Sequence, residues 1–292
     1  MKRVTIALLG VAAALAVGCG GVYRADTSLH MTVPWQGFQR VEVRIPNGHI
    51  EISSGGAEAV SITGEKSAAG ASLSEAQQNL AQVELYAGET EQSGTLLIEL
   101  RYPDALKAKS PAAHVVVQMP APCPAKVTGS NGAIVVSGLE GGVSLATSNG
   151  SIQASDIKGP LSATTSNGRI EVATVTGDLS ARSSNGEIVA RDVNGACALT
   201  TSNGAIRLTG APPAGSRVDL TTTNGAIRLT LPDELAAELK LRTSNGHVRV
   251  SLGDAQVSDV QADRNSYHAL LNGGGGQIVA TTSNGAITVE AR

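Results

Sequence analysis

A short unit built around Asn-Gly recurs through the second half of the chain, and its spacing constrains the fold more than any other feature. Within each unit the third and fifth residues after Asn are apolar, and such alternation predicts a strand with one buried face. A second alternating segment closes each unit. The Asn residues of the repeat lie 18, 18, 18, 18, 21, 21 and 39 residues apart, at Asn131, Asn149, Asn167, Asn185, Asn203, Asn224, Asn245 and Asn284.

Two short strands per repeat predict one coil of a solenoid, in which coils stack at the strand spacing of a sheet, about 4.8 Å. Connections between parallel strands are nearly always right-handed. We therefore predict an all-β fold, a right-handed parallel β-solenoid with coils of about 18 residues over 129–292. The Asn-Gly pairs would form a structural turn ladder at one corner. There Gly would supply a positive φ, and stacked Asn amides would hydrogen-bond from coil to coil.

The amino-acid composition agrees with thin core layers. The 292 residues include 34 Gly, but only one Phe, one Trp and four Tyr. Such a chain has too few aromatic side chains for a conventional aromatic core. It must instead bury layers of Ile, Val, Leu and Ala.

Residues 40–128 are predicted to form an N-terminal β cap that includes the opening coil of the solenoid. The segment RVEVRIPNGHIEIS has alternating apolar residues on both sides of its own Asn-Gly pair. Ser72 and Glu75 have the spacing of a capping box, which predicts one short helix from Leu73 to about Gln82. The cap would cover the first open sheet edge. Its further strands are predicted near Val83, at 96–102 and at 115–119.

The N-terminal segment MKRVTIALLGVAAALAVGC has the pattern of an export signal: two cations, an uncharged apolar run and a small residue before Cys19. Its end resembles the lipobox of bacterial lipoproteins, in which the cysteine becomes the lipidated first residue. We predict a lipoprotein signal peptide at 1–18, lipidation of Cys19 and a lipidated tether at 19–39. Gly20 follows in place of an acidic residue, which favours anchoring in the outer membrane of the bacterial cell envelope.

The net charge argues against binding of nucleic acid, and the positions of the cysteines argue against a disulfide. Removal of the signal takes away Lys2 and Arg3, which changes the net charge from −3 to −5, so nucleic acid is not an expected partner. Cys197 occupies an inward position of the repeat. Cys123 lies four coils earlier, roughly 19 Å away at the sheet spacing and beyond disulfide reach. We predict no disulfide between them.

Six segments of the chain point together to one known family. They are VRIPNGHIEIS, SLSEAQQNLAQ, GTLLIELRY, VVVQMPAPCPAKVTGSNGAI, the serial TSNG coils and LLNGGGGQIVATTSNGAITVEAR. From about residue 40 to the C-terminus, the chain resembles the DUF4097 family of bacterial envelope proteins with β-strand repeats. The resemblance implies an adhesin-like envelope protein and supplies no catalytic residue, metal or cofactor.

A polysaccharide-acting enzyme on a β-helix is the alternative. Such enzymes need paired carboxylates or acids that hold a metal, usually beside aromatic platforms for sugar. Asp156 and Asp192 occupy equivalent places two coils apart, about 9.6 Å, with Thr174 between them. That separation just exceeds the distance between the two carboxyl groups of inverting glycosidases. Tyr267 is also the only aromatic residue after Asn131. The histidines show no metal-ligand spacing. We interpret the acids as exposed turn residues and predict no catalytic residue, metal site or cofactor.

Arg207, Arg228 and Arg249 each lie four residues after an Asn of the repeat. We name them the arginine stripe and predict that they project outward from three consecutive coils, about 5 Å apart. Like charges at that distance repel by about 1 kcal/mol in water, which neighbouring acids or an anionic ligand could relieve. Since most acids fall toward the opposite corner, the solenoid is expected to be charge-segregated. The stripe is a candidate site for an anionic glycan, lipid or envelope protein; solvated arginines are the alternative.

The longer repeat units all grow from the corner opposite Asn-Gly, and the largest insertion covers 251–276. Insertions on one edge often build the binding surface of a solenoid, although surface loops also tolerate insertion without a function. The sequence therefore predicts a lipid-anchored structural or binding module of the cell envelope, adhesin-like and without catalysis. It would contact the membrane through its N-terminal lipid.

Overall fold

The computed structural model describes residues 12–13, 22–90 and 94–292. The predicted signal peptide and Cys19 lie outside these residues, apart from the two-residue strand β1 (Ala12–Ala13). The chain divides into two compact units, 1–147 and 148–292. Within the described residues, no helix has the length and apolar character needed to cross a membrane.

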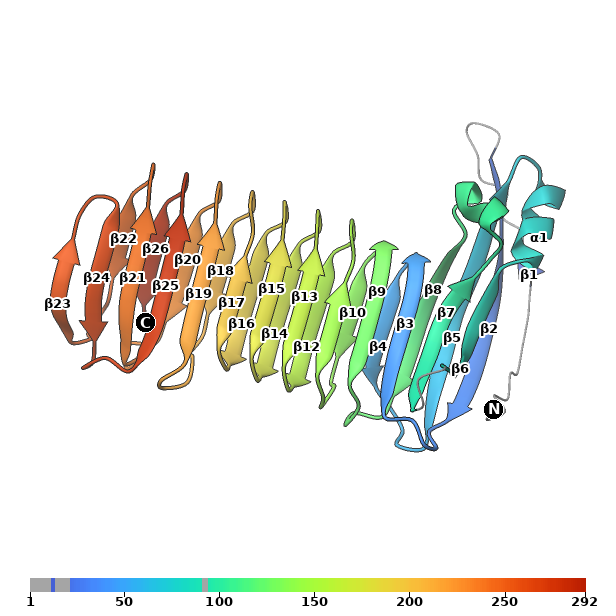
Figure 1. Cartoon of the computed structure of the whole chain (residues 1–292), viewed down its shortest axis with the longest axis horizontal. Coiled ribbons are helices and arrows are strands. Elements are labelled where there is room, and N and C mark those ends of the chain that lie inside the picture. The colour runs from blue at the N-terminus through green and yellow to red at the C-terminus, as the bar shows by residue number, and fades with distance from the viewer. Residues whose placement is uncertain (1–11, 14–21, 91–93) are drawn as a thin grey trace. The chain divides into compact units, whose positions relative to one another are not determined.

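The N-terminal unit consists of two sheets, of order β1-β2-β5-β8-β4-β10 and β11-β9-β3-β7-β6 (Figure 1). The first contains β2 (Tyr23–Pro34), β5 (Ala59–Gly70), β8 (Ala112–Met119), β4 (Ile50–Ser54) and β10 (Ile134–Ser137). The second contains β11 (Val143–Ala146), β9 (Ala125–Asn131), β3 (Arg40–Asn47), β7 (Thr95–Arg101) and β6 (Glu84–Glu89).

The opening coil of this unit stacks on the first repeat coil, although the two are far apart in sequence. β3 pairs with β9 in parallel, and β4 pairs with β10 with Ile50 opposite Ile134. Asn47 lies opposite Asn131, so both coils share one register. The alternating apolar residues are buried, as predicted for strands with one face toward a core.

The cap contains the predicted helix, α1 (Leu73–Ala81). The Ser72 hydroxyl accepts a hydrogen bond from the Glu75 backbone N–H at 3.1 Å, and the Glu75 carboxylate accepts one from Ala71 N–H at 2.8 Å. These bonds satisfy backbone donors that the first helical turn leaves free. The buried side of α1 packs on β2 and β5 (Figure 1). A short 3₁₀ helix, Asp104–Lys109, was not predicted.

The predicted tether at 19–39 is wrong for most of its length. β2 is a strand of 12 residues that pairs antiparallel with β5 along its whole length. Leu29, Met31 and Val33 alternate along it and are buried at 6, 3 and 2% exposure. The alternation of buried and exposed residues is thus present in the sequence, but it is short. It also lies close to the predicted lipidation site, since β2 begins at Tyr23.

The C-terminal unit also has two sheets, of order β12-β14-β16-β18-β20-β26-β22 and β23-β24-β21-β25-β19-β17-β15-β13. The first contains β12 (Ile152–Lys158), β14 (Ile170–Thr176), β16 (Ile188–Asn194), β18 (Ile206–Thr209), β20 (Ile227–Leu231), β26 (Ile287–Ala291) and β22 (Val248–Ser251). The second contains β23 (Val257–Ala262), β24 (Ser266–Leu271), β21 (Ala237–Thr243), β25 (Gly276–Thr282), β19 (Arg217–Thr222), β17 (Cys197–Thr200), β15 (Leu179–Ser183) and β13 (Leu161–Thr165).

The coils of this unit confirm the parallel β-solenoid. Equivalent positions pair in register, such as Ile170 with Ile188 in one sheet and Leu179 with Cys197 in the other. These inward side chains are at most 4% exposed and form the core between the two sheets. Among the described strands of this unit, only the pairings of β24 with β21 and with β23 are antiparallel.

The last coil lies out of chain order. β25 pairs with β19 on one side and β21 on the other, while β26 lies between β20 and β22 (Figure 1). The coil of residues 276–291 is therefore inserted between two coils that are consecutive in sequence. The predicted insertion at 251–276 forms the hairpin β23–β24, which extends the sheet beyond β21.

The boundary between the compact units also differs from the predicted boundary at residue 128. It falls after Thr147, so the first repeat coil, with β9, β10 and β11, belongs to the N-terminal unit. The direct pairing of β9 with β3 and of β10 with β4 gives the reason, because these strands continue the sheets of the cap.

Candidate functional site

The Asn side chains of the repeat form a hydrogen-bonded ladder. In the N-terminal unit, Asn131 Nδ2 donates to Asn47 Oδ1 at 2.8 Å. In the C-terminal unit each Nδ2 donates to the Oδ1 of the next Asn at 2.7–2.8 Å, in the order Asn245, Asn284, Asn224, Asn203, Asn185, Asn167, Asn149. Inner members thus use both the donor and the acceptor of the amide. The ladder follows the spatial order of the coils and is a structural feature.

In the C-terminal unit, the glycine of the Asn-Gly pairs has a different role from the predicted one. Gly48 and Gly132 have a positive φ, but Gly168, Gly186 and their later equivalents do not. A Cβ added to Gly168 would lie 1.7 Å from the carbonyl oxygen of Gly150, and the same distance separates a Cβ on Gly186 from Gly168 O. Glycine is needed at these corners because the backbones of neighbouring coils approach too closely for any side chain.

The Ser and Thr residues of the corner are also structural. Thr165 Oγ1 donates to Gly150 O at 3.0 Å and accepts from Gly168 N–H at 3.2 Å. Ser183 makes the equivalent pair of contacts one coil later. Both side chains are 3% exposed. Their hydroxyls therefore satisfy buried backbone groups and are closed to a substrate.

Backbone geometry explains the acids considered for catalysis. Asp156, Thr174 and Asp192 have φ of 55, 55 and 53°, and all three are exposed. The parallel pairing skips them and resumes at the buried Ile157 and Val175. Asp tolerates the left-handed region because its short side chain can hydrogen-bond locally. The two carboxylates thus occupy a repeated bend. In the part of the chain that the structure describes, no group of three or more His, Cys, Asp or Glu is placed to hold a metal.

The arginine stripe is not continuous. Arg207 pairs with Arg228 across β18 and β20, but Thr288 of β26 lies between Arg228 and Arg249. The prediction of three consecutive coils is wrong, because the last coil inserts at this point. Arg228 and Arg249 are two strand spacings apart, about 9.6 Å.

The predicted charge segregation is also wrong. Glu187 accepts from Arg207, and it also accepts from Arg169 at 2.6 Å. Glu171 accepts from Arg191 at 2.6 Å, and this hydrogen bond lowers the pKa of Glu171. Acidic and basic side chains therefore alternate on this face, and Arg207 has an acidic partner. Such exposed pairs contribute little stability, about 0–1 kcal/mol each.

Arg228 and Arg249 differ from these paired arginines. Both are exposed, and neither makes an ion pair within 4.0 Å with another described residue. Thr288, between them, carries no charge. A cation in this setting keeps its donors for water or for an anionic ligand.

The insertion brings a third arginine to the same place. The turn between β23 and β24 reaches the Asn-Gly corner, where Val248 N–H donates to Arg264 O at 3.0 Å and Thr243 N–H to Asn265 O at 2.9 Å. Arg264 is exposed and likewise has no ion-pair partner among the described residues. We call Arg228, Arg249 and Arg264 the arginine surface. Sequence reasoning missed Arg264 because it lies outside the repeat register.

The two described cysteines, Cys123 and Cys197, are buried and free. Burial raises the pKa of the Cys123 thiol to about 11 and that of Cys197 to about 12. Thiols of this kind are inert core residues, since reactivity requires the thiolate.

Three solved structures are similar to this chain at low sequence identity. A "putative adhesin" from Bacteroides fragilis NCTC 9343 is 11% identical with a TM-score of 0.39, covering 91% of this chain and 97% of that one. A "Putative lipid binding protein" from Parabacteroides distasonis ATCC 8503 is 15% identical with a TM-score of 0.39, covering 93% and 98%. A "putative cell adhesion protein" from Clostridium sporogenes ATCC 15579 is 12% identical with a TM-score of 0.29, covering 91% and 100%.

Among curated proteins, none matches this chain significantly. The family model described as Toastrack DUF4097 matches residues 21–290, which include every repeat coil and the cap. The chain therefore belongs to the DUF4097 family.

Proposed function

We propose that this protein is a lipid-anchored, non-catalytic, adhesin-like module of the bacterial cell envelope that binds an anionic polymer through its arginine surface. The observation that carries the proposal is the difference between arginines of one solenoid. Arg169, Arg191 and Arg207 have acidic partners, whereas Arg228 and Arg249 have none among the described residues.

The arrangement suits a ligand that repeats its negative charges. Arg228 and Arg249 are held about 9.6 Å apart by two strand spacings, and Arg264 is tied to β22 through its own backbone. A guanidinium binds a carboxylate or a phosphate through two parallel hydrogen bonds. A glycan with a carboxylate or phosphate on successive sugars could therefore contact several arginines at once. Multiple weak contacts of this kind add up along one chain.

The anchoring part of the proposal is supported by the N-terminal sequence alone. The charged start, apolar run and Cys19 fit a lipoprotein signal. Metabolic labelling with an alkyne analogue of palmitate tests this directly. The native chain should incorporate the label and fractionate with membranes, and Cys19→Ser should do neither. Labelling of the Cys19→Ser variant would contradict the assignment.

Retention on immobilised polygalacturonate tests whether the arginine surface binds an anionic polymer. The native protein should be retained and should elute as salt is raised, because exposed charges are screened within a Debye length of about 10 Å at 0.1 M salt. The triple variant Arg228→Ser, Arg249→Ser, Arg264→Ser should elute at much lower salt. Its matched control is Arg169→Ser with Arg191→Ser, which removes paired arginines of the same solenoid and should leave retention unchanged.

Two results would contradict the proposed ligand. One is retention of the triple variant at the native salt concentration. The other is retention that does not change with salt. Protease accessibility of the protein in intact cells then tests its role, because an adhesin must be exposed at the cell surface.

A further inference from the structure

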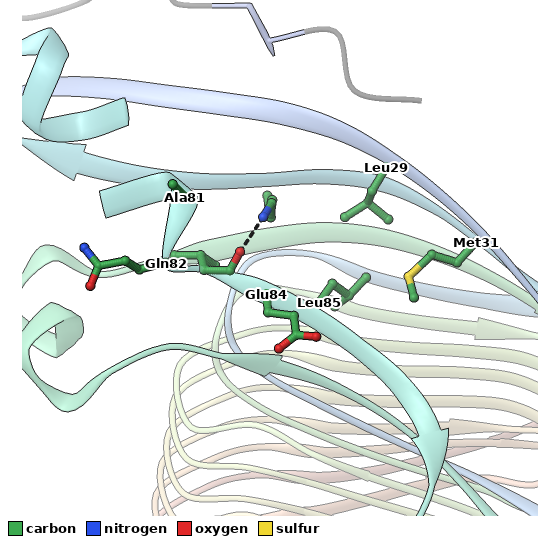
Figure 2. Close-up of a pocket in the computed structure, with 8 residues that line it drawn as sticks. Leu29, Met31, Ala81, Gln82, Glu84 and Leu85 are labelled. Carbon is green, nitrogen blue, oxygen red and sulfur yellow. Dashed lines mark hydrogen bonds between the residues drawn. The ribbon is translucent and has the colours of Figure 1, made fainter. Parts of the chain in front are cut away.

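The N-terminal unit contains a pocket of about 360 Å³ beside the C-terminal end of α1 (Figure 2). Its apolar walls come from both sheets: Leu29 and Met31 lie on β2, and Leu85 lies on β6. These three side chains are at most 7% exposed, so the pocket opens into the core between the sheets. Ala81, at the last position of α1, is exposed and lies at the edge of the pocket. The volume is in the range of pockets that hold small ligands, about 300–1,000 Å³.

One cation lines this otherwise apolar space. Lys66 of β5 is half-buried, and its Nζ donates to the carbonyl oxygen of Val83, the hydrogen bond drawn in Figure 2. Burial lowers the pKa of Lys66, against a smaller opposite effect of Glu84. No carboxylate of the described residues lies within 4.0 Å of the ammonium.

The ammonium of Lys66 has unused hydrogen-bonding capacity. A lysine ammonium has three donors, and the carbonyl of Val83 accepts one. A partly buried charge is costly unless it is paired and hydrogen-bonded. The remaining donors therefore favour an anionic group at the pocket, and the adjoining apolar walls favour an aliphatic chain. Glu84 is exposed and does not occupy these donors in an ion pair.

We propose that this pocket binds a single-chain anionic amphiphile of the fatty-acid class, with its carboxylate on Lys66 and its chain between Leu29, Met31 and Leu85. The two contacts recognise different parts of one molecule. The apolar walls recognise the length and the apolar character of the aliphatic chain. Lys66 distinguishes a carboxylate from a neutral head group. The site is separate from the arginine surface, so it does not depend on the proposed polymer.

Calorimetric titration of the full chain with dodecanoate and with dodecanol, each below the concentration at which it aggregates, tests both contacts. The native protein should bind dodecanoate saturably with a stoichiometry near one. Lys66→Met keeps an unbranched side chain but removes the charge. It should weaken dodecanoate binding at least tenfold and leave dodecanol binding unchanged.

A second pair of variants tests the chain contact. Ala81→Trp places a large side chain at the pocket edge from an exposed position, and it should abolish binding of dodecanoate. Gln77→Trp is its matched control, because Gln77 is exposed on the same helix but does not line the pocket. That variant should bind as the native protein does. Circular dichroism of each variant checks that it is folded.

The proposal is overturned by any of three results. The first is the absence of saturable dodecanoate binding to the native protein. The second is a Lys66→Met variant that binds dodecanoate with native affinity, or one whose affinities for dodecanoate and dodecanol fall equally. The third is native binding in a folded Ala81→Trp variant.

Discussion

Stacking distance, and not backbone dihedral, explains glycine at the Asn-Gly corners of the C-terminal unit, and Gly168→Ala tests this explanation. The added Cβ would lie 1.7 Å from Gly150 O, where contacts under 3.0 Å are essentially never seen. Relief needs a backbone movement of more than about 1 Å. That movement strains the hydrogen bonds from Ser166 N–H and Asn167 N–H to Ser148 O, of 3.1 and 3.0 Å.

The expected cost follows from these contacts. Overpacking by one methyl group costs about 1–3 kcal/mol where side chains can adjust. Here the obstacle is backbone, and each strained hydrogen bond contributes about 1 kcal/mol more. We expect Gly168→Ala to lower the free energy of unfolding by about 3 kcal/mol or more. At about 2–4 °C per kcal/mol, the thermal midpoint should fall by roughly 6–12 °C.

Urea unfolding followed by circular dichroism, together with calorimetry, measures this change. The matched control is Gly56→Ala, since an added Cβ there meets no atom within 4 Å and φ is not positive. Its stability should stay within about 1 kcal/mol of the native value. Gly168→Asn separates the two explanations, because Asn tolerates a positive φ but is larger than Ala. Native-like stability of Gly168→Ala, or a Gly168→Asn variant more stable than Gly168→Ala, would refute the stacking argument.

Four further measurements test other parts of the structure. Asn185→Ala removes one donated and one accepted ladder bond, of 2.7 and 2.8 Å, and should lower the unfolding free energy by about 1–2 kcal/mol in urea; no change would contradict a stabilising ladder. Ser72→Ala should cost about 1 kcal/mol in the same assay by removing the cap of α1. Hydrogen bonds from Lys240, His268 and Gln277 lower the pKa of Glu238 from 4.5 to about 2. The contribution of the Glu238 carboxylate to folding stability should therefore be complete above pH 4.5 and lost as the pH falls toward 2. NMR titration of the carboxyl group measures that pKa, a midpoint near 4.5 would contradict it, and Glu238→Gln should lack this pH dependence. Cys123 and Cys197 should titrate equally with and without reductant in denaturant, and a gain of two thiols on reduction would disprove the free state.

The repeat sequence predicts the coil well because each coil contains the same local information. Alternation around Ile170 and Leu179 indicates which side chains are inward, and the structure buries them at 0 and 2% exposure. The third inward position, Ile157 or Val175, was missed. There a residue with positive φ interrupts the period of two, and sequence alternation alone cannot show on which side the strand resumes.

The candidate site was only partly predictable. Arg207, Arg228 and Arg249 are indeed exposed on one sheet, as their repeat position indicates. The acidic partner of Arg207 is not local in sequence: Glu187 lies 20 residues from Arg207 and pairs with it across neighbouring coils. Arg264 belongs to an insertion without repeat register, and only the pairing of the β23–β24 hairpin brings it to β22.

The sequence by itself determined the unit of this fold: the coil of about 18 residues, its inward and outward positions, the capped helix and the Asn-Gly corner. These depend on period, turn chemistry and capping, which are local. Only the tertiary structure decided the order of the coils, in which β25 and β26 lie between coils that precede them in the chain. Every coil presents the same hydrogen-bonding edge and has its Asn and apolar residues at the same positions. The sequence alone therefore does not indicate which coils are neighbours. The antiparallel docking of β24 on β21 occupies one edge of that strand and leaves the other for the returning chain, and this places Thr288 between Arg228 and Arg249.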